Sequence, residues 1–125
     1  MQGEQRAGDI ESAISRNAGV PEVSAAWTAQ NLKRVRVLDV REDDELMGPL
    51  GHIDGLRHIP LNELHRAAVA LPSDESLVVV CRSGARSGAA AAALEKIGFK
   101  RVASMAGGML AWNELGFPVV RHPHR

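Results

Sequence analysis

The sequence predicts an α/β domain in which a mainly parallel sheet carries helices on both faces. Short apolar, β-branched runs alternate with helix-forming segments, which is the pattern of repeated strand–helix–strand units. The clearest strand, Leu77–Val80, is continuously apolar, as expected for a strand that is covered on both sides. A chain of 125 residues with 45% hydrophobic content is long enough for one ordinary core. These three observations indicate a single domain.

The chain divides into a polar beginning, one domain and a short tail. Residues 1–20 are polar and weakly patterned, and we assign this lead-in no chemistry, although Asp9–Asn17 could form one helix. Stronger signals begin at Pro21, so the domain is predicted over residues 21–120, with residues 121–125 as a mobile tail.

In the first part of the domain, strand and helix signals follow one another. The spacing of apolar residues between Val23 and Leu32 predicts a helix, and the run Val35–Val40 predicts a buried strand. A short apolar piece, His58–Leu61, predicts a second strand, followed by a helix over Asn62–Ala70.

The second part of the domain has the stronger signals. After the strand Leu77–Val80, an alanine-rich helix is predicted over Ala89–Lys96 and closed by Gly98 at a C-terminal cap position. A short strand at Val102–Met105 and a helix over Met109–Leu115 complete the pattern.

Charge and composition argue against several kinds of partner. Lys plus Arg and Asp plus Glu number 15 each, so no overall field attracts nucleic acid or an anionic membrane. No apolar run approaches the roughly 18 residues of a membrane-spanning helix, and the N-terminus lacks the apolar stretch of a secretory signal, so we expect a cytoplasmic protein. His122 and His124 have no cysteine or carboxylate at metal-ligand spacing, and no metal site is expected.

In open parallel sheets the site lies beyond the carboxyl ends of the strands. Three segments follow predicted strands here: Asp39 with Arg41, the loop Cys81–Ser87, and Ala106–Gly108. We expect all three to meet at one edge of the sheet. Of these, the loop joins the strongest strand to the strongest helix.

The loop Cys81–Ser87 has the composition of an anion-binding turn. Its small residues let backbone N–H groups converge above the cysteine sulfur, and the following helix N-terminus and two arginines favour the thiolate over the thiol. The alternative is that Cys81 is a buried apolar residue at a strand end, as free cysteines commonly are. Because the chain has one cysteine, no second thiol of its own can resolve an adduct on Cys81, and the acceptor must be another molecule.

Four segments in this order resemble the signature segments of the rhodanese family: Val37–Glu42, Gly51–Gly55, Cys81–Ser87 and Gly107–Trp112. The resemblance covers about residues 21–120. It implies a single rhodanese-like domain with a mainly parallel five-stranded sheet flanked by helices. It also implies an active-site cysteine that cycles between thiol and persulfide, with no other cofactor.

Carried over by position, Cys81 matches the sulfur-bearing nucleophile of this family. Asp39 and Arg41 match a supporting pair at the strand end, although a plain surface ion pair explains them equally well. His52 matches a packing residue of a turn rather than a general base, and Trp112 is expected in the core. The residues that match the loop around the terminal sulfur are Arg82, Ser83, Gly84, Ala85, Arg86 and Ser87.

The length and composition of the loop separate three possible activities. Four residues lie between Cys81 and Arg86, one fewer than in the phosphatases related to this family. The resemblance therefore implies a pocket sized for a sulfane sulfur rather than for a phosphate or arsenate. Ser83 stands where thiosulfate-preferring members carry lysine. The resemblance therefore predicts a sulfurtransferase that takes sulfur from thiosulfate or a small persulfide and passes it to cyanide, a thiol or a sulfur-carrier protein. A module that binds an anion or a partner without turnover is the alternative, and phosphatase or arsenate reductase chemistry ranks third.

Overall fold

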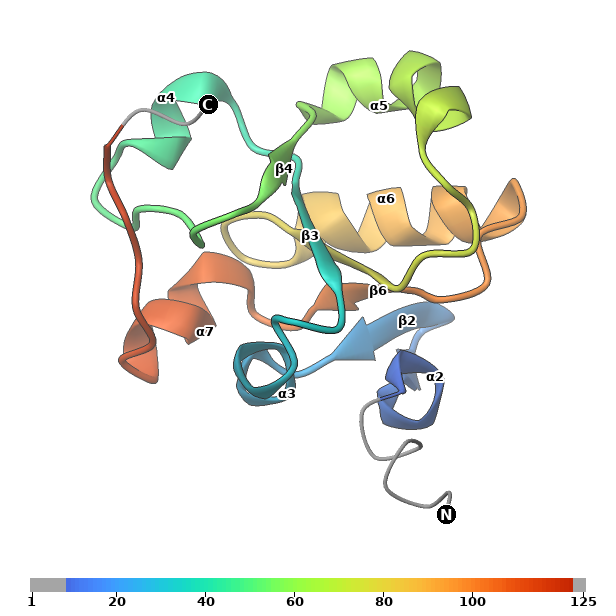
Figure 1. Cartoon of the computed structure of the whole chain (residues 1–125), viewed down its shortest axis with the longest axis horizontal. Coiled ribbons are helices and arrows are strands. Elements are labelled where there is room, and N and C mark those ends of the chain that lie inside the picture. Colours follow the sequence, from blue (N-terminus) through green and yellow to red (C-terminus); the bar gives the residue numbers. More distant parts are fainter. Residues whose placement is uncertain (1–8, 123–125) are drawn as a thin grey trace.

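A six-stranded sheet, in the order β1-β2-β6-β5-β3-β4, forms the centre of the protein (Figure 1). The computed structural model describes residues 9–122. All neighbouring strands are parallel except β1 and β2, which pair antiparallel. The strands are β1 (Ser15–Asn17), β2 (Val20–Val23), β3 (Arg36–Asp39), β4 (Arg57–His58), β5 (Leu77–Val80) and β6 (Val102–Met105).

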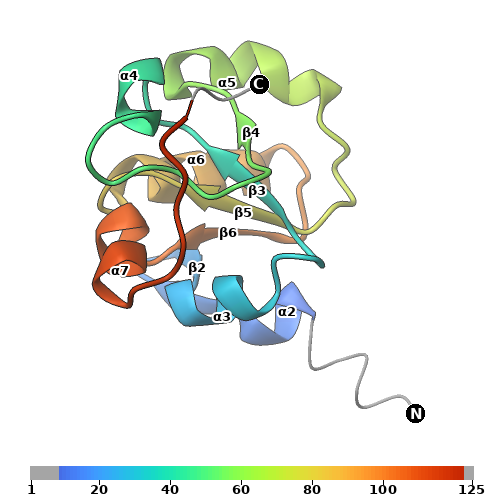
Figure 2. The same cartoon turned by 60° about the vertical axis from the view of Figure 1, so that its left-hand side comes forward.

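Helices cover both faces of the sheet, as predicted. Figures 1 and 2 show α5 and α6 on one side of the sheet and α2, α3 and α7 on the other. The helices are α2 (Ile10–Ala13), α3 (Ala25–Gln30), α4 (Asp43–Leu46), α5 (Leu61–Ala67) with the 3₁₀ turn Ala68–Ala70, α6 (Ala85–Lys96) and α7 (Gly108–Glu114). Within residues 9–122, no helix has both the length and the apolar character needed to cross a membrane.

The alternation of side chains along β5 fixes the direction of Cys81. Leu77 and Val79 belong to the core on the α5–α6 side, whereas Val78 and Val80 belong to the core on the α3–α7 side. Cys81 continues the first series and packs with the α6 side. Its side chain is therefore directed beneath the turn that begins α6.

The N-terminal part of the structure differs from the sequence-based expectation. The helix expected over Asp9–Asn17 is confined to Ile10–Ala13, and Ser15–Asn17 forms the additional strand β1, so the sheet has six strands instead of five. Ala18 and Gly19 join β1 to β2, and both have positive φ (52° and 84°), as the tight turn of a hairpin requires. The usual sequence signal for this turn, Asn-Gly, is absent, because alanine occupies its first position.

Two further differences concern element bounds. Val23 ends β2 instead of beginning a helix, and α3 starts at Ala25. The short helix α4 (Asp43–Leu46) was not predicted at all. Residues 1–8 of the expected lead-in and residues 123–125 of the expected tail, including His124, lie outside the described residues.

Candidate active site

The loop after β5 directs its amides at the sulfur of Cys81. The backbone N–H groups of Gly84 and Ser87 donate to Sγ at N···S distances of 3.1 and 3.3 Å. The thiol in turn contacts the Ser87 hydroxyl at 3.4 Å. These converging donors form a site for a negatively charged sulfur.

Cys81 is deeply placed, with 1% of its surface exposed. A bulky reagent therefore has no direct access to Sγ. Burial agrees with the interpretation of Cys81 as a core residue, but that interpretation does not account for two amides aimed at the sulfur. The loop thus combines the depth of a core position with the donors of a thiolate site.

The surroundings of Cys81 act on its pKa in opposite directions. Burial raises the pKa of the thiol, because it disfavours the charged form. Hydrogen bonds from the Ser87 hydroxyl and from the amides of Ser87, Gly84 and Ser83 lower it, and together they prevail. The net result is a pKa below the usual range for cysteine, so a larger share of Cys81 is thiolate near neutral pH than in a free thiol.

The start of α7 supports the loop from behind. The N–H groups of Met109 and Leu110 donate to the carbonyls of Cys81 and Arg82 at 2.9 and 3.0 Å. A side chain at Gly108 would place its Cβ 2.5 Å from both carbonyl oxygens, and the φ of Gly108 is +57°. The close approach of α7 therefore requires glycine at this position. The segment Ala106–Gly108 thus meets the loop at the expected sheet edge.

Asp39 and Arg41 form a buried ion pair at the end of β3, not a surface pair. Each side chain is 1% exposed, and Nη2 of Arg41 lies 2.8 Å from Oδ2 of Asp39. The remaining N–H groups of the guanidinium donate to the carbonyls of Glu45 (3.3 Å) and Gly51 (2.8 Å). The pair therefore fastens α4 and the segment after it to the sheet edge.

Glu45 is a partner of the loop that the sequence analysis did not identify. Its carboxylate accepts two hydrogen bonds from Arg86, at 2.8 and 2.9 Å. This contact lowers the pKa of Glu45 to about 2, and Glu45 in turn raises the pKa of Arg86 above its usual value. The pair stays ionised through the ordinary carboxyl range and is lost only as pH falls towards about 2. Figure 2 shows the resulting arrangement, with α4 above the turn into α6 and α7 below it.

A second unpredicted partner, Ser104 of β6, lies beneath the nucleophile. Its Oγ is 2.7 Å from Oγ of Ser87, and both serines are 0% exposed. A hydroxyl can accept from a thiol and donate to a thiolate. When Ser104 donates to Ser87, the hydrogen of Ser87 is left for the sulfur or for the carbonyl of Gly84, which lies 3.3 Å away. Ser104 thereby orients the donor that stabilises the charged form of Cys81.

Replacing Ser104 by alanine is therefore expected to raise the pKa of Cys81. The thiolate-to-thiol ratio at a fixed pH below the titration midpoint should fall about two- to five-fold, the share of one hydrogen bond. The ultraviolet absorbance of the thiolate, followed against pH, measures this directly, because the chain has one cysteine and no tyrosine. Thr28→Val is the matched control, since Thr28 is also 0% exposed and bonds the carbonyl of Ser24 at 2.9 Å. A midpoint that moves equally in both variants would contradict a specific role for Ser104.

The remaining candidate residues lie in environments that indicate packing roles. His52 is 2% exposed, and its Nδ1 lies 2.8 Å from the carbonyl of Leu46, as a turn-packing residue would be placed. Trp112 is 0% exposed and donates to the carbonyl of Pro118. His58 is largely buried, and its Nδ1 lies 3.3 Å from Oδ1 of Asp43. Within residues 9–122, no group of three or more His, Cys, Asp or Glu side chains is arranged to hold a metal ion.

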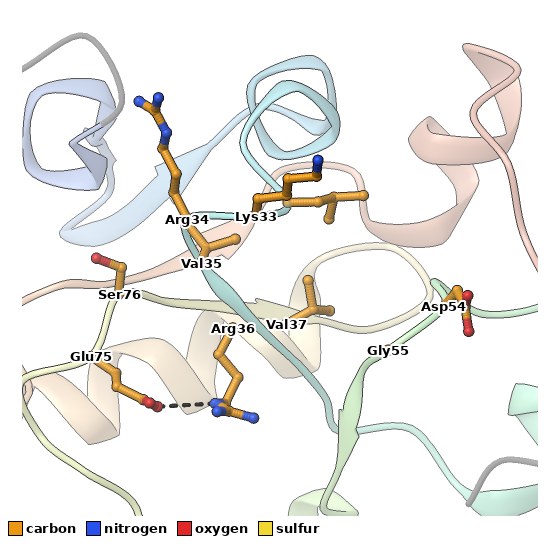
Figure 3. A pocket seen from close by; sticks show the side chains of 10 residues that line it. Lys33, Arg34, Val35, Arg36, Val37, Asp54, Gly55, Glu75 and Ser76 are labelled. Carbon is orange, nitrogen blue, oxygen red and sulfur yellow. Dashed lines mark hydrogen bonds and ion pairs between the residues drawn. The ribbon is translucent and has the colours of Figure 1, made fainter. Parts of the chain in front are cut away.

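A separate hollow lies at the opposite edge of the sheet, where β3 and β5 begin (Figure 3). It has a volume of about 340 Å³ and contains the Arg36–Glu75 pair at 3.0 Å. Asp54 lies on its rim. None of its lining residues belongs to the Cys81–Ser87 loop, so this hollow is not part of the candidate site.

Comparison with known proteins agrees with the fold. The family model of the Rhodanese-like domain matches residues 24–115. The putative sulfur carrier protein YrkF of Bacillus subtilis is 37% identical over 102 residues, which are 78% of this chain and 54% of YrkF. A sulfurtransferase of Allochromatium vinosum is 33% identical over 104 residues, which are 81% of this chain and 95% of that protein. The chain thus spans about half the length of YrkF and nearly all of the second relative.

A solved structure shows the same fold. A rhodanese-related protein from Thermoplasma volcanium superposes with a TM-score of 0.76 at 37% sequence identity, covering 81% of this chain and 98% of that one. The family match includes the strand ends that carry Asp39, Cys81 and Gly108, and it extends over most of the chain. The chain therefore belongs to the rhodanese-like domain family.

Proposed function

We propose that the protein is a sulfurtransferase that carries one sulfur atom on Cys81 between two small molecules. In the first step, the thiolate attacks the outer sulfur of thiosulfate. A new S–S bond forms, the old one breaks, and sulfite leaves with its electron pair. With a small persulfide, R–S–SH, the leaving group is the thiolate of R instead.

In the second step, an acceptor attacks the outer sulfur of the persulfide. Cyanide leaves as thiocyanate and restores the Cys81 thiolate, and a thiol leaves as its own persulfide. A sulfur-carrier protein would accept sulfur by the same route. The covalent persulfide on Cys81 is the only carrier that this scheme needs.

The observation that carries the proposal is the pair of amide contacts to Sγ, from Gly84 and Ser87 at 3.1 and 3.3 Å. Backbone donors that are already in place stabilise charge without rearrangement during the reaction. Their effect on the Cys81 pKa is in the direction that nucleophilic attack requires. Sulfurtransferases among the relatives support the same assignment.

The depth of Cys81 supports a small transferred group. With 1% of the residue exposed, a single sulfur atom fits the approach better than a tetrahedral phosphate does. Ser83 is exposed and uncharged, and it stands where thiosulfate-preferring members of the family carry lysine. We therefore expect small persulfides to load Cys81 faster than thiosulfate does.

Intact mass spectrometry of the wild-type protein tests the proposal. Incubation with a small persulfide or thiosulfate should add the mass of one sulfur atom, and cyanide should remove it and release thiocyanate in equal amount. A protein that stays unmodified by every donor of a panel would overturn the proposal.

A binding role without turnover is the second candidate, because the amides of the Cys81–Ser87 loop would also hold an anion that does not react. The same experiment separates the two functions. A binding module would leave the mass unchanged, whereas a sulfurtransferase would be loaded and unloaded repeatedly, producing more thiocyanate than there is protein.

A further inference from the structure

A hollow between α4 and the Cys81–Ser87 loop adjoins the candidate site. It has a volume of about 350 Å³, enough for a small organic molecule. Arg82, which follows Cys81 directly, forms one side, and Glu45, which holds Arg86 of the loop, forms another. The lining residues are Arg41, Asp44, Glu45, Gly48, Pro49, Leu50 and Arg82.

Two of the four charged side chains in this hollow are already paired. Arg41 is bound to Asp39, and Glu45 is bound to Arg86. The other two, Asp44 and Arg82, are exposed, and their charged groups have no hydrogen bond or ion pair within residues 9–122. One carboxylate and one guanidinium therefore remain available to a ligand.

The lining segment Gly48–Leu50 is held in place by two side chains. The carbonyl of Leu50 accepts from Nδ2 of Asn113 at 3.0 Å, and the carbonyl of Pro49 accepts from Nε of Arg121 at 3.1 Å. These contacts hold this part of the lining in place. The hollow is therefore formed in advance of binding.

We propose that this hollow binds the head group of a small aminothiol, a molecule with an ammonium group, a carboxylate and one sulfur. Asp44 would bind the ammonium, and Arg82 the carboxylate, for which a guanidinium is suited by its paired donors. The inference rests on the proposed sulfur transfer. Only the outer sulfur enters the loop, so the rest of the molecule must lie next to Arg82.

The same subsite serves both half-reactions. In loading, an aminothiol persulfide gives its outer sulfur to Cys81 and leaves as thiolate, with one S–S bond formed and one broken. In unloading, the thiol sulfur attacks the outer sulfur of the Cys81 persulfide, and one S–S bond forms as the bond to Sγ breaks. The proton of the attacking thiol passes to the transferred sulfur, and Cys81 leaves with the electron pair as the thiolate. The group that leaves in one direction is the group that attacks in the other, so one head-group site recognises donor and acceptor.

A panel of four thiols tests the assignment. The protein is loaded with inorganic polysulfide and then unloaded with one of four thiols. Cysteine carries both the ammonium and the carboxylate, cysteamine only the ammonium, 3-mercaptopropionate only the carboxylate, and 2-mercaptoethanol neither. Each rate is divided by the 2-mercaptoethanol rate of the same variant, which removes general effects on the sulfur. Asp44→Asn should lower the normalised unloading rates of cysteine and cysteamine about two- to five-fold and leave that of 3-mercaptopropionate unchanged. Arg82→Gln should lower the normalised rates of cysteine and 3-mercaptopropionate by a similar factor and leave the normalised rate of cysteamine at its wild-type value, whatever the change does to all four rates together.

Asp54→Asn is the matched control, because Asp54 is an exposed carboxylate at the other hollow (Figure 3). Its four rates should equal those of the wild type. A donor arm compares loading by cysteine persulfide with loading by polysulfide, and Asp44→Asn should slow the former alone. Loading that succeeds while all thiols respond alike in every variant would overturn the head-group site and leave sulfur transfer standing. Failure of the wild type to load with polysulfide, thiosulfate and cysteine persulfide alike would overturn both.

Discussion

Replacing Cys81 by serine is expected to abolish sulfur loading completely. The change exchanges one atom and leaves the amides of Gly84 and Ser87 directed at the same place. A serine hydroxyl is not ionised by these donors at neutral pH, and oxygen cannot form the S–S bond that holds the transferred atom. Intact mass after incubation with polysulfide should show no added sulfur, and thiocyanate formation should fall to the level without protein.

Urea unfolding of the same variant separates a loss of chemistry from a loss of folding. The free energy of unfolding of Cys81→Ser in urea should lie within about 1 to 2 kcal/mol of the wild type, because serine is only slightly smaller and its hydroxyl can accept from the same amides of Gly84 and Ser87. An adduct of equal amount on the serine variant would show that sulfur is carried elsewhere and would remove Cys81 from the mechanism.

Arg41→Leu is expected to cause the largest loss of stability among single changes at the site. The change leaves the carboxylate of Asp39 buried at 1% exposure without its counter-ion, which costs about 3–5 kcal/mol. It also leaves the carbonyl of Gly51 without the donor that now lies at 2.8 Å. Such a loss is a large part of the stability of a small domain, and urea unfolding should reveal it as a lower transition midpoint.

Two further variants test whether burial of the Asp39 carboxylate causes the loss of stability in Arg41→Leu. Arg36→Leu breaks an exposed pair with Glu75 and should cost about 1 kcal/mol or less. Adding Asp39→Asn to Arg41→Leu should recover part of the loss, because no uncompensated carboxylate remains. Equal losses in Arg36→Leu and Arg41→Leu would mean that the Asp39–Arg41 pair does not anchor this edge.

The strands nearest the site were predictable because their signal is local. Leu77–Val80 and Val102–Met105 are β5 and β6 with the predicted bounds, since short continuous apolar runs indicate covered strands. The α6 helix begins four residues earlier than the alanine run, at Ala85, because Gly84, with its φ of +105°, ends the turn and lets the helix start.

The supporting residues were not predictable, because their partners are distant in sequence. Glu45 lies in a run of four acidic residues that resembles a solvated surface, and only the fold brings it to Arg86. Ser104 had a weak local signal, a polar residue inside an otherwise apolar strand, but nothing in the sequence pointed to Ser87 as its partner. The Asp39–Arg41 pair was recognised, whereas its burial depends on how α4 folds over it.

The contact of α7 with the loop affects when the protein acquires a reactive sulfur. The carbonyls of Cys81 and Arg82 are bound by amides of Met109 and Leu110, which are synthesised well after the loop itself. Until that late helix docks, the loop lacks two of the hydrogen bonds that hold its curvature and turn the Gly84 and Ser87 amides inward. A nascent or partly unfolded chain should then carry a thiol of ordinary acidity, slow to react with oxidants, and reactivity should develop together with the completed fold.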